Sequence, residues 1–298
     1  MLIHAVTEER KPVGCHYVPQ KYLLGFTGSS SPDALWQFDK KTLSFSEQPV
    51  SIKRIAQQRS FYDADTERQL NELVEGPGNR VLDKLRSGDF SLRDEERVAL
   101  SVYIATMLKR VPHHRAKGEA MAPGILRKVT SELREQIRAY ADAGDLSTET
   151  AEARLAETDA AEAKLAVELP DNVRKEIRSP WPTGEMIDCV YGMHWRFVCA
   201  DGDDYFLVTD NPAFFFECYG IATENSELTF PVSHSLAIFG SWTPIANGKR
   251  ISRRTQFVKE ANRRLISYAV RFVYSRGKDN WICKVAAKDR PHLSRIGW

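Results

Sequence analysis

The chain has 298 residues, of which 42% are hydrophobic and 28% charged, an ordinary balance for one large globular domain or two modest ones. No run approaches the roughly 18 apolar residues that a membrane helix requires, which excludes a spanning segment. The first thirteen residues carry Glu8, Glu9, Arg10 and Lys11 and lack a long apolar stretch, so we expect no secretory signal.

The net charge of +2 conceals an uneven distribution. Eight acidic and two basic residues lie from Asp142 to Glu168, a net −6, and residues 185–227 are also acidic. Fourteen basic and three acidic residues lie from Lys249 to Arg295, a net +11. A basic block can attract nucleic-acid phosphates, but opposite blocks in one chain more often complement each other inside the fold.

The cysteines are odd in number and widely spaced, and no Cys-x-x-Cys pair is present. This pattern argues against a disulfide framework and against a zinc site. We therefore expect reduced thiols and a cytoplasmic protein. The five residues are Cys15, Cys189, Cys199, Cys218 and Cys283.

Residues 1–64 are predicted to form an N-terminal β segment. Alternating residues from Leu35 to Asp39, a polar tip, and a second apolar piece at Leu43 and Phe45 predict a β-hairpin.

Residues 65–178 are predicted to be helical. One helix should stop before Pro112, and Pro123 should open the next. The Ala/Glu-rich stretch 148–168 has high helix propensity and a narrow apolar face, which predicts a projecting helical hairpin. The helix after Pro123 carries an apolar stripe of Leu126, Val129, Leu133, Ile137 and Tyr140.

Residues 179–298 are predicted to be β-rich with a final basic helix. That helix should run from Arg253 to Tyr274 and present Arg253, Arg264 and Arg271 on one face. The predicted strands are Met186–Tyr191, Trp195–Ala200, Tyr205–Thr209, Leu228–Pro231, Leu236–Phe239 and Ile282–Ala286. We expect one α+β unit over 1–298, in which the N-terminal hairpin and a C-terminal mixed sheet pack with the helical middle.

Several segments, taken in order, match a known pattern: His16–Phe26, Leu35–Asp39, Phe61-Tyr62 with Glu67, Lys109–Arg115, Phe206–Pro212, Phe230–His234, Ala261-Asn262 and Tyr274-Ser275. They resemble a bacterial family known as domain of unknown function 4238, and the first segment is the most specific of them. Two positions in later segments depart from the family, with Thr209 in place of a serine and His234 in place of a proline. The resemblance implies an intact domain but no reaction.

His16 and Tyr17 are the leading catalytic candidates, since a histidine and a tyrosine can act as general base and hydrogen-bond donor. Gln20 would bind substrate beside them. The alternative is that His16 bonds backbone while Tyr17 packs in the core. A His-His-x-x-Pro-type metal nuclease is disfavoured, because the next histidines, His113 and His114, lie nearly one hundred residues away.

Asp210 and Asn211 follow an apolar run and precede Pro212, where a strand edge can present polar groups to a ligand. We take Asp210 as a third catalytic candidate and Asn211 as substrate-binding. The alternative is a turn in which both side chains bond the backbone.

The last predicted helix carries further candidates for substrate binding, namely Gln256, Asn262 and Arg271. The cationic group from Arg110 to Arg115 could hold phosphate, but cations at a helix C-terminus are commonly structural. The sequence contains no Gly-rich phosphate loop and no dinucleotide fingerprint.

Two functions remain open. The first is a nucleic-acid-directed hydrolase, a nuclease-like effector of phage defence or of a toxin system, with His16 as base and no metal or cofactor. The second is a non-catalytic regulatory module that binds a protein partner through the acidic helical arm. Neither reading involves a membrane.

Overall fold

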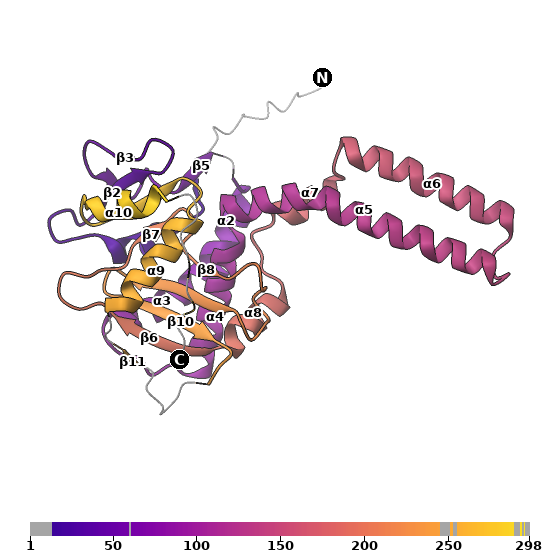
Figure 1. Cartoon of the computed structure of the whole chain (residues 1–298). Helices are drawn as coiled ribbons and strands as arrows, with labels where there is room; N and C mark the ends of the chain where they lie inside the picture. Colours follow the sequence, from indigo (N-terminus) through magenta and orange to yellow (C-terminus); the bar gives the residue numbers. More distant parts are fainter. Residues whose placement is uncertain are drawn as a thin grey trace, which may run out of the picture. The chain divides into compact units, whose positions relative to one another are not determined.

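A computed structural model describes residues 14–59, 61–244, 251–252, 255–288, 293 and 295. The chain divides into two compact units, one of residues 1–112 with 181–298 and one of residues 113–180 (Figure 1). Helices and largely antiparallel sheets make up the fold, which confirms the α+β class.

The first unit begins with strands that alternate with short helices. In chain order these elements are β1 (Gly14–His16), α1 (Gln20–Leu23), the 3-10 helix η1 (Leu24–Phe26), β2 (Ala34–Asp39), β3 (Ser44–Phe45), β4 (Val50–Ser51), β5 (Gln57–Arg59), α2 (Ala64–Gln69), the π-helix η2 (Leu70–Glu75), α3 (Gly76–Arg86) and α4 (Asp94–Lys109). After the second unit it resumes with α8 (Gly184–Gly192), β6 (His194–Cys199), β7 (Val208–Thr209), β8 (Phe214–Phe215), β9 (Glu227–Ser233), β10 (Leu236–Ser241), β11 (Ile251–Ser252), α9 (Thr255–Tyr268), β12 (Phe272–Ser275) and α10 (Asn280–Ala286).

Two five-stranded sheet assemblies and a small β1–β5 pair form the β part of this unit. The larger sheet has the order β11-β6-β10-β9-β8, and only β11 pairs in parallel, with β6. The other has the order β3-β2-β12-β7, with β4 paired to β2. The predicted hairpin is confirmed by the pairing of Phe38 with Phe45, and its first strand also pairs with β12 near the end of the chain.

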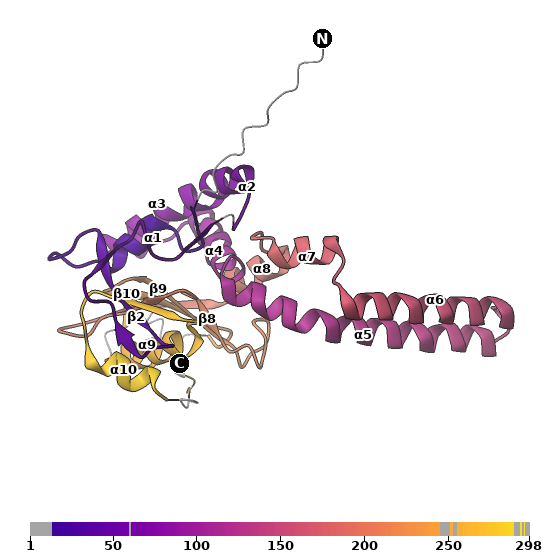
Figure 2. The same cartoon turned by 90° about the horizontal axis from the view of Figure 1, so that it is seen from above.

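Both faces of the larger sheet are buried. Leu236 and Ile238 of β10 join the largest apolar core, whereas Ala237 and Phe239 join a second core that includes residues of α9. This alternation follows from the two-residue period of a strand, and it explains why β10 reads as a continuous apolar run. Figure 2 shows α1, α3 and α4 on one side of the sheets and α9 and α10 on the other.

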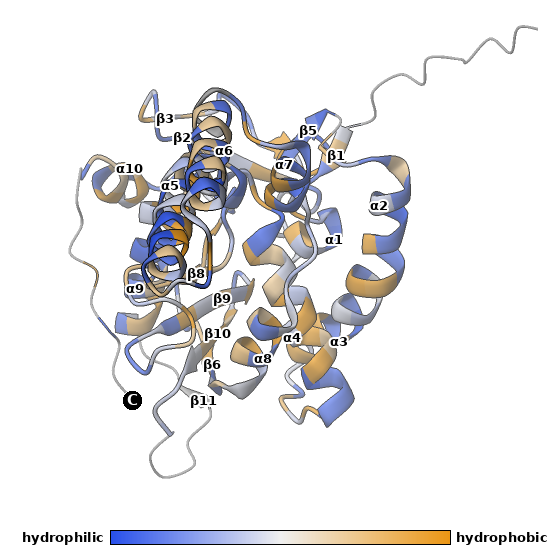
Figure 3. Cartoon of the chain, turned by 90° about the vertical axis from the view of Figure 1, so that its right-hand side faces the viewer, coloured by the Kyte–Doolittle hydropathy of each residue, from blue (hydrophilic) through white to orange (hydrophobic). Residues whose placement is uncertain are grey.

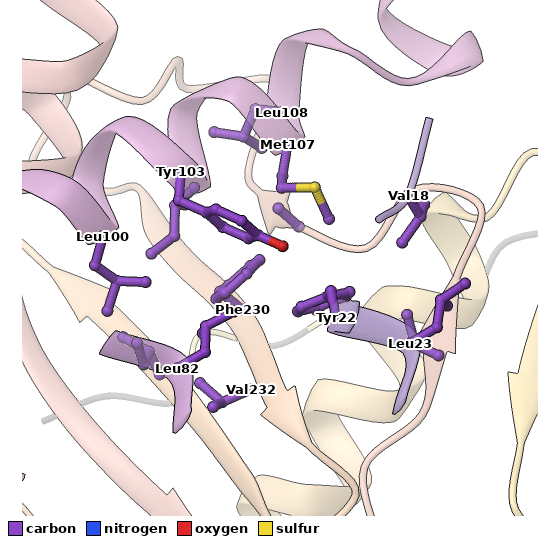
Figure 4. Close-up of a cluster of buried hydrophobic side chains, with 14 of the residues drawn as sticks. Val18, Tyr22, Leu23, Leu82, Leu100, Tyr103, Met107, Leu108, Phe230 and Val232 are labelled. Atoms are coloured by element: carbon purple, nitrogen blue, oxygen red, sulfur yellow. The ribbon is translucent and has the colours of Figure 1, made fainter. Parts of the chain in front are cut away.

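The largest core lies between α1, α3, α4 and β9 (Figure 4). The Tyr22 ring stacks on Phe230 at 5.4 Å, and the Tyr22 hydroxyl donates to the Pro231 carbonyl at 2.6 Å. α3 approaches α4 closely at Gly78, where an added Cβ would lie 2.3 Å from the Tyr103 ring, so this position requires glycine. Figure 3 shows the hydrophobic stretches along α3 and α4.

The second unit consists of α5 (Pro112–Asp142, entered from the first unit), α6 (Thr148–Val167) and α7 (Asp171–Arg178). α5 and α6 lie side by side as a helical hairpin in both Figure 1 and Figure 2. The prediction that Pro123 opens a helix was wrong, because α5 begins at Pro112 and continues through Pro123. Pro112 already occupies the favourable first position, and the residues between are mostly good helix formers.

Two predicted strands are helices. Residues 186–191 lie in α8, where the Thr183 side chain accepts the Met186 amide at 3.3 Å as an N-cap. Residues 282–286 lie in α10, with Ile282 buried and Val285 packed in the same cluster. Short apolar runs do not distinguish a strand from a helix by periodicity, which accounts for both errors.

The predicted final helix is also shorter than expected. α9 ends at Tyr268, and the residues predicted to continue it form β12, which pairs with β2 and β7. Arg253, predicted on the basic face, lies outside the described residues. No helix of the described part is both long and apolar enough to cross a membrane.

Candidate active site

Polar residues from β1 and from the stretch 62–75 meet around Arg110, which follows the last residue of α4. We call this group the Arg110 cluster; its members are His16, Tyr62, Glu67, Glu75 and Arg110. The members come from the end of β1, the loop before α2, α2 itself, η2 and the end of α4.

Arg110 is the buried centre of the cluster, with 2% of its surface exposed. Its guanidinium donates to Glu75 Oε1 at 2.7 Å and to the His16 carbonyl at 2.5 Å. The Tyr62 hydroxyl donates to the Arg110 carbonyl at 2.7 Å. Burial opposes the charge of Arg110, but Glu75 together with Tyr62 and Tyr103 offsets burial, and the pKa of the guanidinium is raised. Arg110 therefore remains a cation that fixes the positions of its neighbours.

His16 is half-buried, and the polar atoms of its ring are covered. Its Nδ1 lies 3.3 Å from Gln20 Nε2, Nε2 is shielded from solvent, and the backbone of Ile52 and Lys53 interacts with the ring. Burial lowers the pKa of His16, against the opposing effect of the Ile52 and Lys53 backbone. The ring is therefore neutral near pH 7, and Gln20 orients it.

Glu67 is the second titratable side chain of the Arg110 cluster that has a shielded polar atom. It is half-buried, and Oε2 is shielded without a hydrogen-bond partner among the described residues. Burial raises the pKa of Glu67; Arg110 opposes this shift and Glu75 adds to it. Since Glu75 and Arg110 also act on His16, His16 and Glu67 share the same charged neighbours.

The position of Glu75 depends on the π-helix η2, which interrupts the α2–α3 helix over Leu70–Glu75. Leu70 and Val74 of this segment are buried in the core, so the wider turn is held by packing while Glu75 reaches Arg110. Single-turn π segments inside α-helices occur frequently at functional sites.

Three exposed cations lie on the segment that runs beside His16. β5 pairs with β1 so that His16 faces Gln57 and Gly14 faces Arg59, and the preceding turn carries Lys53 and Arg54. We call Lys53, Arg54 and Arg59 the cationic patch. Within the described residues none of the three forms an ion pair, so their charges are available to an anionic ligand.

The cluster contains an imidazole and two carboxylates, which are common metal donors. Even so, among the residues that the structure describes, no three His, Cys, Asp or Glu side chains are gathered closely enough to hold a metal ion. Among the described residues, no cysteine forms a disulfide with another.

Tyr17 and Asp210, predicted to join His16, belong to a different environment. Tyr17 is buried, with a pKa raised by burial and by the Asp210 carboxylate, and Tyr274 lies beside it. The pKa of Asp210 is raised by burial and lowered by the amides of residues 270–272. Tyr17 and Asp210 therefore lie near each other, whereas His16 interacts with Glu75 and Arg110. Successive residues of an extended chain point to opposite sides, which separates Tyr17 from His16.

The two predicted asparagines are buried and bond the backbone. Asn262 of α9 accepts the Leu207 amide at 2.9 Å and donates to the Tyr205 carbonyl at 2.7 Å. Asn211 donates to the Tyr268 carbonyl at 3.2 Å. Both amides therefore hold α9 against the segment that leads into β7 and β8.

The remaining predicted residues lie along α9 and after it. Gln256 is exposed in the first turn. Arg271 donates to Asp39 Oδ2 through Nε at 2.9 Å and through its terminal nitrogen at 2.7 Å. Arg264, predicted on an open basic face, is fully buried, with an ion pair to Glu227 at 2.5 Å. The basic block is thus partly neutralised inside the fold.

Two surface pockets of the first unit lie outside the Arg110 cluster. One of about 320 Å³ is walled by aromatic residues, among them Phe90, Tyr191 and Trp195. Another of about 270 Å³ lies between α9 and α10 and includes Asn262 in its wall, with Asp204 and Lys259. In neither pocket is His16 or Glu67 a lining residue.

Sequence reasoning did not select Glu67, Glu75 or Tyr62, and it favoured a structural role for Arg110. The sequence did contain a signal for three of these residues, because Tyr62, Glu67 and Arg110 lie in the segments that resemble the family. Glu75 carried no such signal, since its position follows from the π-helix.

A comparison with known families finds a match over residues 16–279, to a family described as "Protein of unknown function (DUF4238)". No curated protein and no solved structure matches the chain. The matched region contains every member of the Arg110 cluster and the whole cationic patch.

Proposed function

This chain belongs to the DUF4238 family, and from that premise we propose that it is an enzyme that cleaves phosphodiester bonds of nucleic acids by general acid/base catalysis at the Arg110 cluster. The observation that carries the proposal is that two half-buried titratable groups with shielded polar atoms, His16 and Glu67, share Arg110 and Glu75 as charged neighbours. Their pKa values shift in opposite directions and therefore approach each other.

In this mechanism neutral His16 accepts the proton of the attacking hydroxyl, from water or a ribose, as its oxygen bonds to phosphorus. Protonated Glu67 donates its proton to the leaving oxygen as the phosphorus–oxygen bond breaks. Arg110 is a positioning residue, because its two terminal nitrogens are already bonded to Glu75 and to the His16 carbonyl.

His16 Nε2 and Glu67 Oε2 are shielded, so productive binding requires rotation of the two side chains. Each residue is only half-buried, and within this proposal a side-chain rotation brings its polar end to the surface. Catalytic hydrogen bonds are commonly completed only when substrate binds.

The cationic patch supports a polyanionic substrate. Lys53, Arg54 and Arg59 lie on the segment paired with β1 and can neutralise successive phosphates beside His16. Arg264 and Arg271, by contrast, already hold carboxylate partners within the fold.

The first test is cleavage of single-stranded RNA, single-stranded DNA and duplex DNA by the purified full chain, with Mg²⁺ and with chelator. We expect His16→Gln and Glu67→Gln each to lower the rate by roughly a hundredfold. Replacing the cationic patch with serine should weaken binding and flatten its salt dependence.

The matched control is Glu72→Gln, because Glu72 lies on the same π-helix but is exposed and paired with Arg68 at 3.2 Å. It should leave the rate unchanged. The proposal fails if none of the three substrates is cleaved, or if the His16 and Glu67 variants match this control while remaining folded.

The dependence of the cleavage rate on pH separately tests the assignment of His16 as the base and Glu67 as the acid. The active form needs neutral His16, whose pKa lies below 6.5, and protonated Glu67, whose pKa lies above 4.5. The rate should rise as pH increases through the pKa of His16 and fall as pH increases through the pKa of Glu67. We therefore expect the cleavage rate to be highest at mildly acidic pH. The decrease in rate at higher pH should disappear in Glu67→Gln. A rate that is highest at alkaline pH would contradict these two roles.

Within this proposal the enzyme acts in the cytoplasm as an effector of phage defence or of a toxin system, where its thiols would stay reduced. The second candidate is a regulatory module without catalysis. It is favoured by one observation, an exposed apolar surface on α5, and it takes the lead if the cleavage test fails.

A further inference from the structure

The pocket between α9 and α10 belongs to the first unit and contains no member of the Arg110 cluster. We call it the α9–α10 pocket. The two helices pack through a small apolar core that includes Ile266 of α9 and Ile282 of α10. With a volume of about 270 Å³ the pocket is at the small end of ligand sites, which suits a molecule of amino-acid size better than a large cofactor.

The interior of the α9–α10 pocket is apolar and partly aromatic. Tyr205 and Trp281 line it with their ring centres 6.2 Å apart, in an edge-to-face arrangement. Val258 and Val285 line it as well. Val258 belongs to the apolar core beside β10, whereas the other three belong to the core between α9 and α10, so the pocket lies where two cores meet. A ligand that fills this interior must carry an apolar group.

The wall of the pocket is held in place by hydrogen bonds. Asn262, which is 3% exposed, accepts the Leu207 amide at 2.9 Å and donates to the Tyr205 carbonyl at 2.7 Å. The Tyr205 hydroxyl donates to the Asp279 carboxylate. These bonds fix the tyrosine before any ligand arrives, so binding does not have to order it.

Opposite charges line the pocket from two different elements. Asp203 and Asp204 come from the turn that follows β6. Lys259 and Arg263 come from successive turns of α9, and Arg263 bonds Glu260 at 3.0 Å. Within the described part of the chain, Asp203, Asp204 and Lys259 form no ion pair with one another or with any other group. Acidic and basic side chains therefore line one pocket without neutralising each other.

We propose that the α9–α10 pocket binds a free α-amino acid with a large apolar side chain. That side chain fills the apolar interior against Tyr205 and Trp281. The ammonium group of the ligand pairs with Asp204, and its carboxylate pairs with Lys259. Only a free amino acid carries both charges next to one side chain, which distinguishes it from a residue within a peptide.

The charges of the pocket disfavour other ligands of this size. Carboxylates beside the cations repel a phosphate or a nucleic-acid strand, and a wholly apolar molecule leaves both sets of charges without a partner. Since the charged side chains lie at the surface, we expect a Kd on the order of tens of micromolar. The proposal does not depend on the function of the Arg110 cluster.

Isothermal titration of the purified full chain with L-leucine, L-phenylalanine and L-tryptophan, each to about 5 mM, provides the test. At least one should bind with a stoichiometry of one per chain. The N-acetyl derivative of the tightest ligand lacks the positive charge and its amide derivative lacks the negative charge, so each should bind at least tenfold more weakly. Glycine keeps both charges but lacks a side chain, and it should not bind measurably.

Variants of the protein test the same contacts from the other side. Lys259→Gln and Asp204→Asn should each weaken binding at least tenfold. The matched controls are Lys284→Gln, at an exposed position of α10, and Asp201→Asn, in the same turn as Asp204; neither residue lines the pocket. Both controls should bind like the natural chain, and circular dichroism should show unchanged folding in all four variants.

Three results would each overturn the proposal. The first is that none of the three amino acids binds. The second is that the acetylated and amidated derivatives bind as tightly as the parent, since the pocket would then recognise only an apolar group. The third is that the folded Lys259 and Asp204 variants bind like the two controls.

Discussion

At Asp210 the two carboxylate oxygens accept three backbone amides. Oδ1 accepts from Val270 at 2.9 Å, and Oδ2 accepts from Arg271 at 2.7 Å and from Phe272 at 2.8 Å. These bonds turn the chain out of α9 and into β12. The residue selected from sequence as a strand-end site group thus matches the alternative considered for it, a carboxylate that holds backbone.

We predict that Asp210→Ala lowers the free energy of unfolding by about 3 kcal/mol or more, because buried amides lose their acceptors. Asp210→Asn keeps one acceptor and should cost less. Urea titration of both variants measures the difference. If the proposed cleavage activity is observed, the folded Asp210→Asn protein should keep the rate of the natural chain, and a hundredfold loss of rate in a stable variant would return Asp210 to the catalytic group.

At the scale of elements, α9 is joined to β9 by a buried ion pair. Arg264 donates to Glu227 at 2.5 Å and to Thr229 at 2.9 Å, and its guanidinium lies 4.9 Å from the centre of the Phe216 ring. Both charged side chains are completely buried. The acidic strands and the basic helix therefore complement each other inside the fold, which was the interpretation favoured from sequence.

Removing one partner of this pair should be costly because the other charge stays buried. We predict that Arg264→Met lowers the free energy of unfolding by about 3 kcal/mol or more. Arg264→Met combined with Glu227→Gln should lose less than the sum of the single changes. A double-mutant cycle by urea denaturation checks this, and simple additivity would show that the two residues are not coupled.

The elements that could be predicted from sequence are those whose hydrophobic residues follow a clear helix or strand period. The 35–45 hairpin, the 148–168 helix and the strands β9 and β10 were all predicted. α8 and α10 were misread because an apolar run of five or six residues satisfies either period. The Arg110 cluster could not be assembled from sequence, because its members lie up to 94 residues apart and a π-helix sets the position of Glu75.

For the whole molecule, the proposed activity predicts an effect on cells. Induced expression of the natural chain should slow bacterial growth through cleavage of nucleic acid, and His16→Gln and Glu67→Gln should relieve it. Glu72→Gln should remain inhibitory. Growth curves at matched protein levels, with gel analysis of total RNA and DNA, provide the measurement; equal growth of all four strains would contradict an effector role.

The pairing of β2 with β12 has a consequence for how the protein is made. Trp36 and Ser275 are register partners, so a strand synthesised near the beginning must wait for one synthesised more than two hundred residues later. At roughly 5 to 20 residues per second, that interval lasts on the order of ten seconds or more on the ribosome. The helical unit of residues 113–180 is continuous in sequence, so it can form during the wait. A nascent chain that stops before residue 272 would expose the unpaired edge of β2, which makes stalled or truncated products of this protein candidates for aggregation and for quality-control proteases.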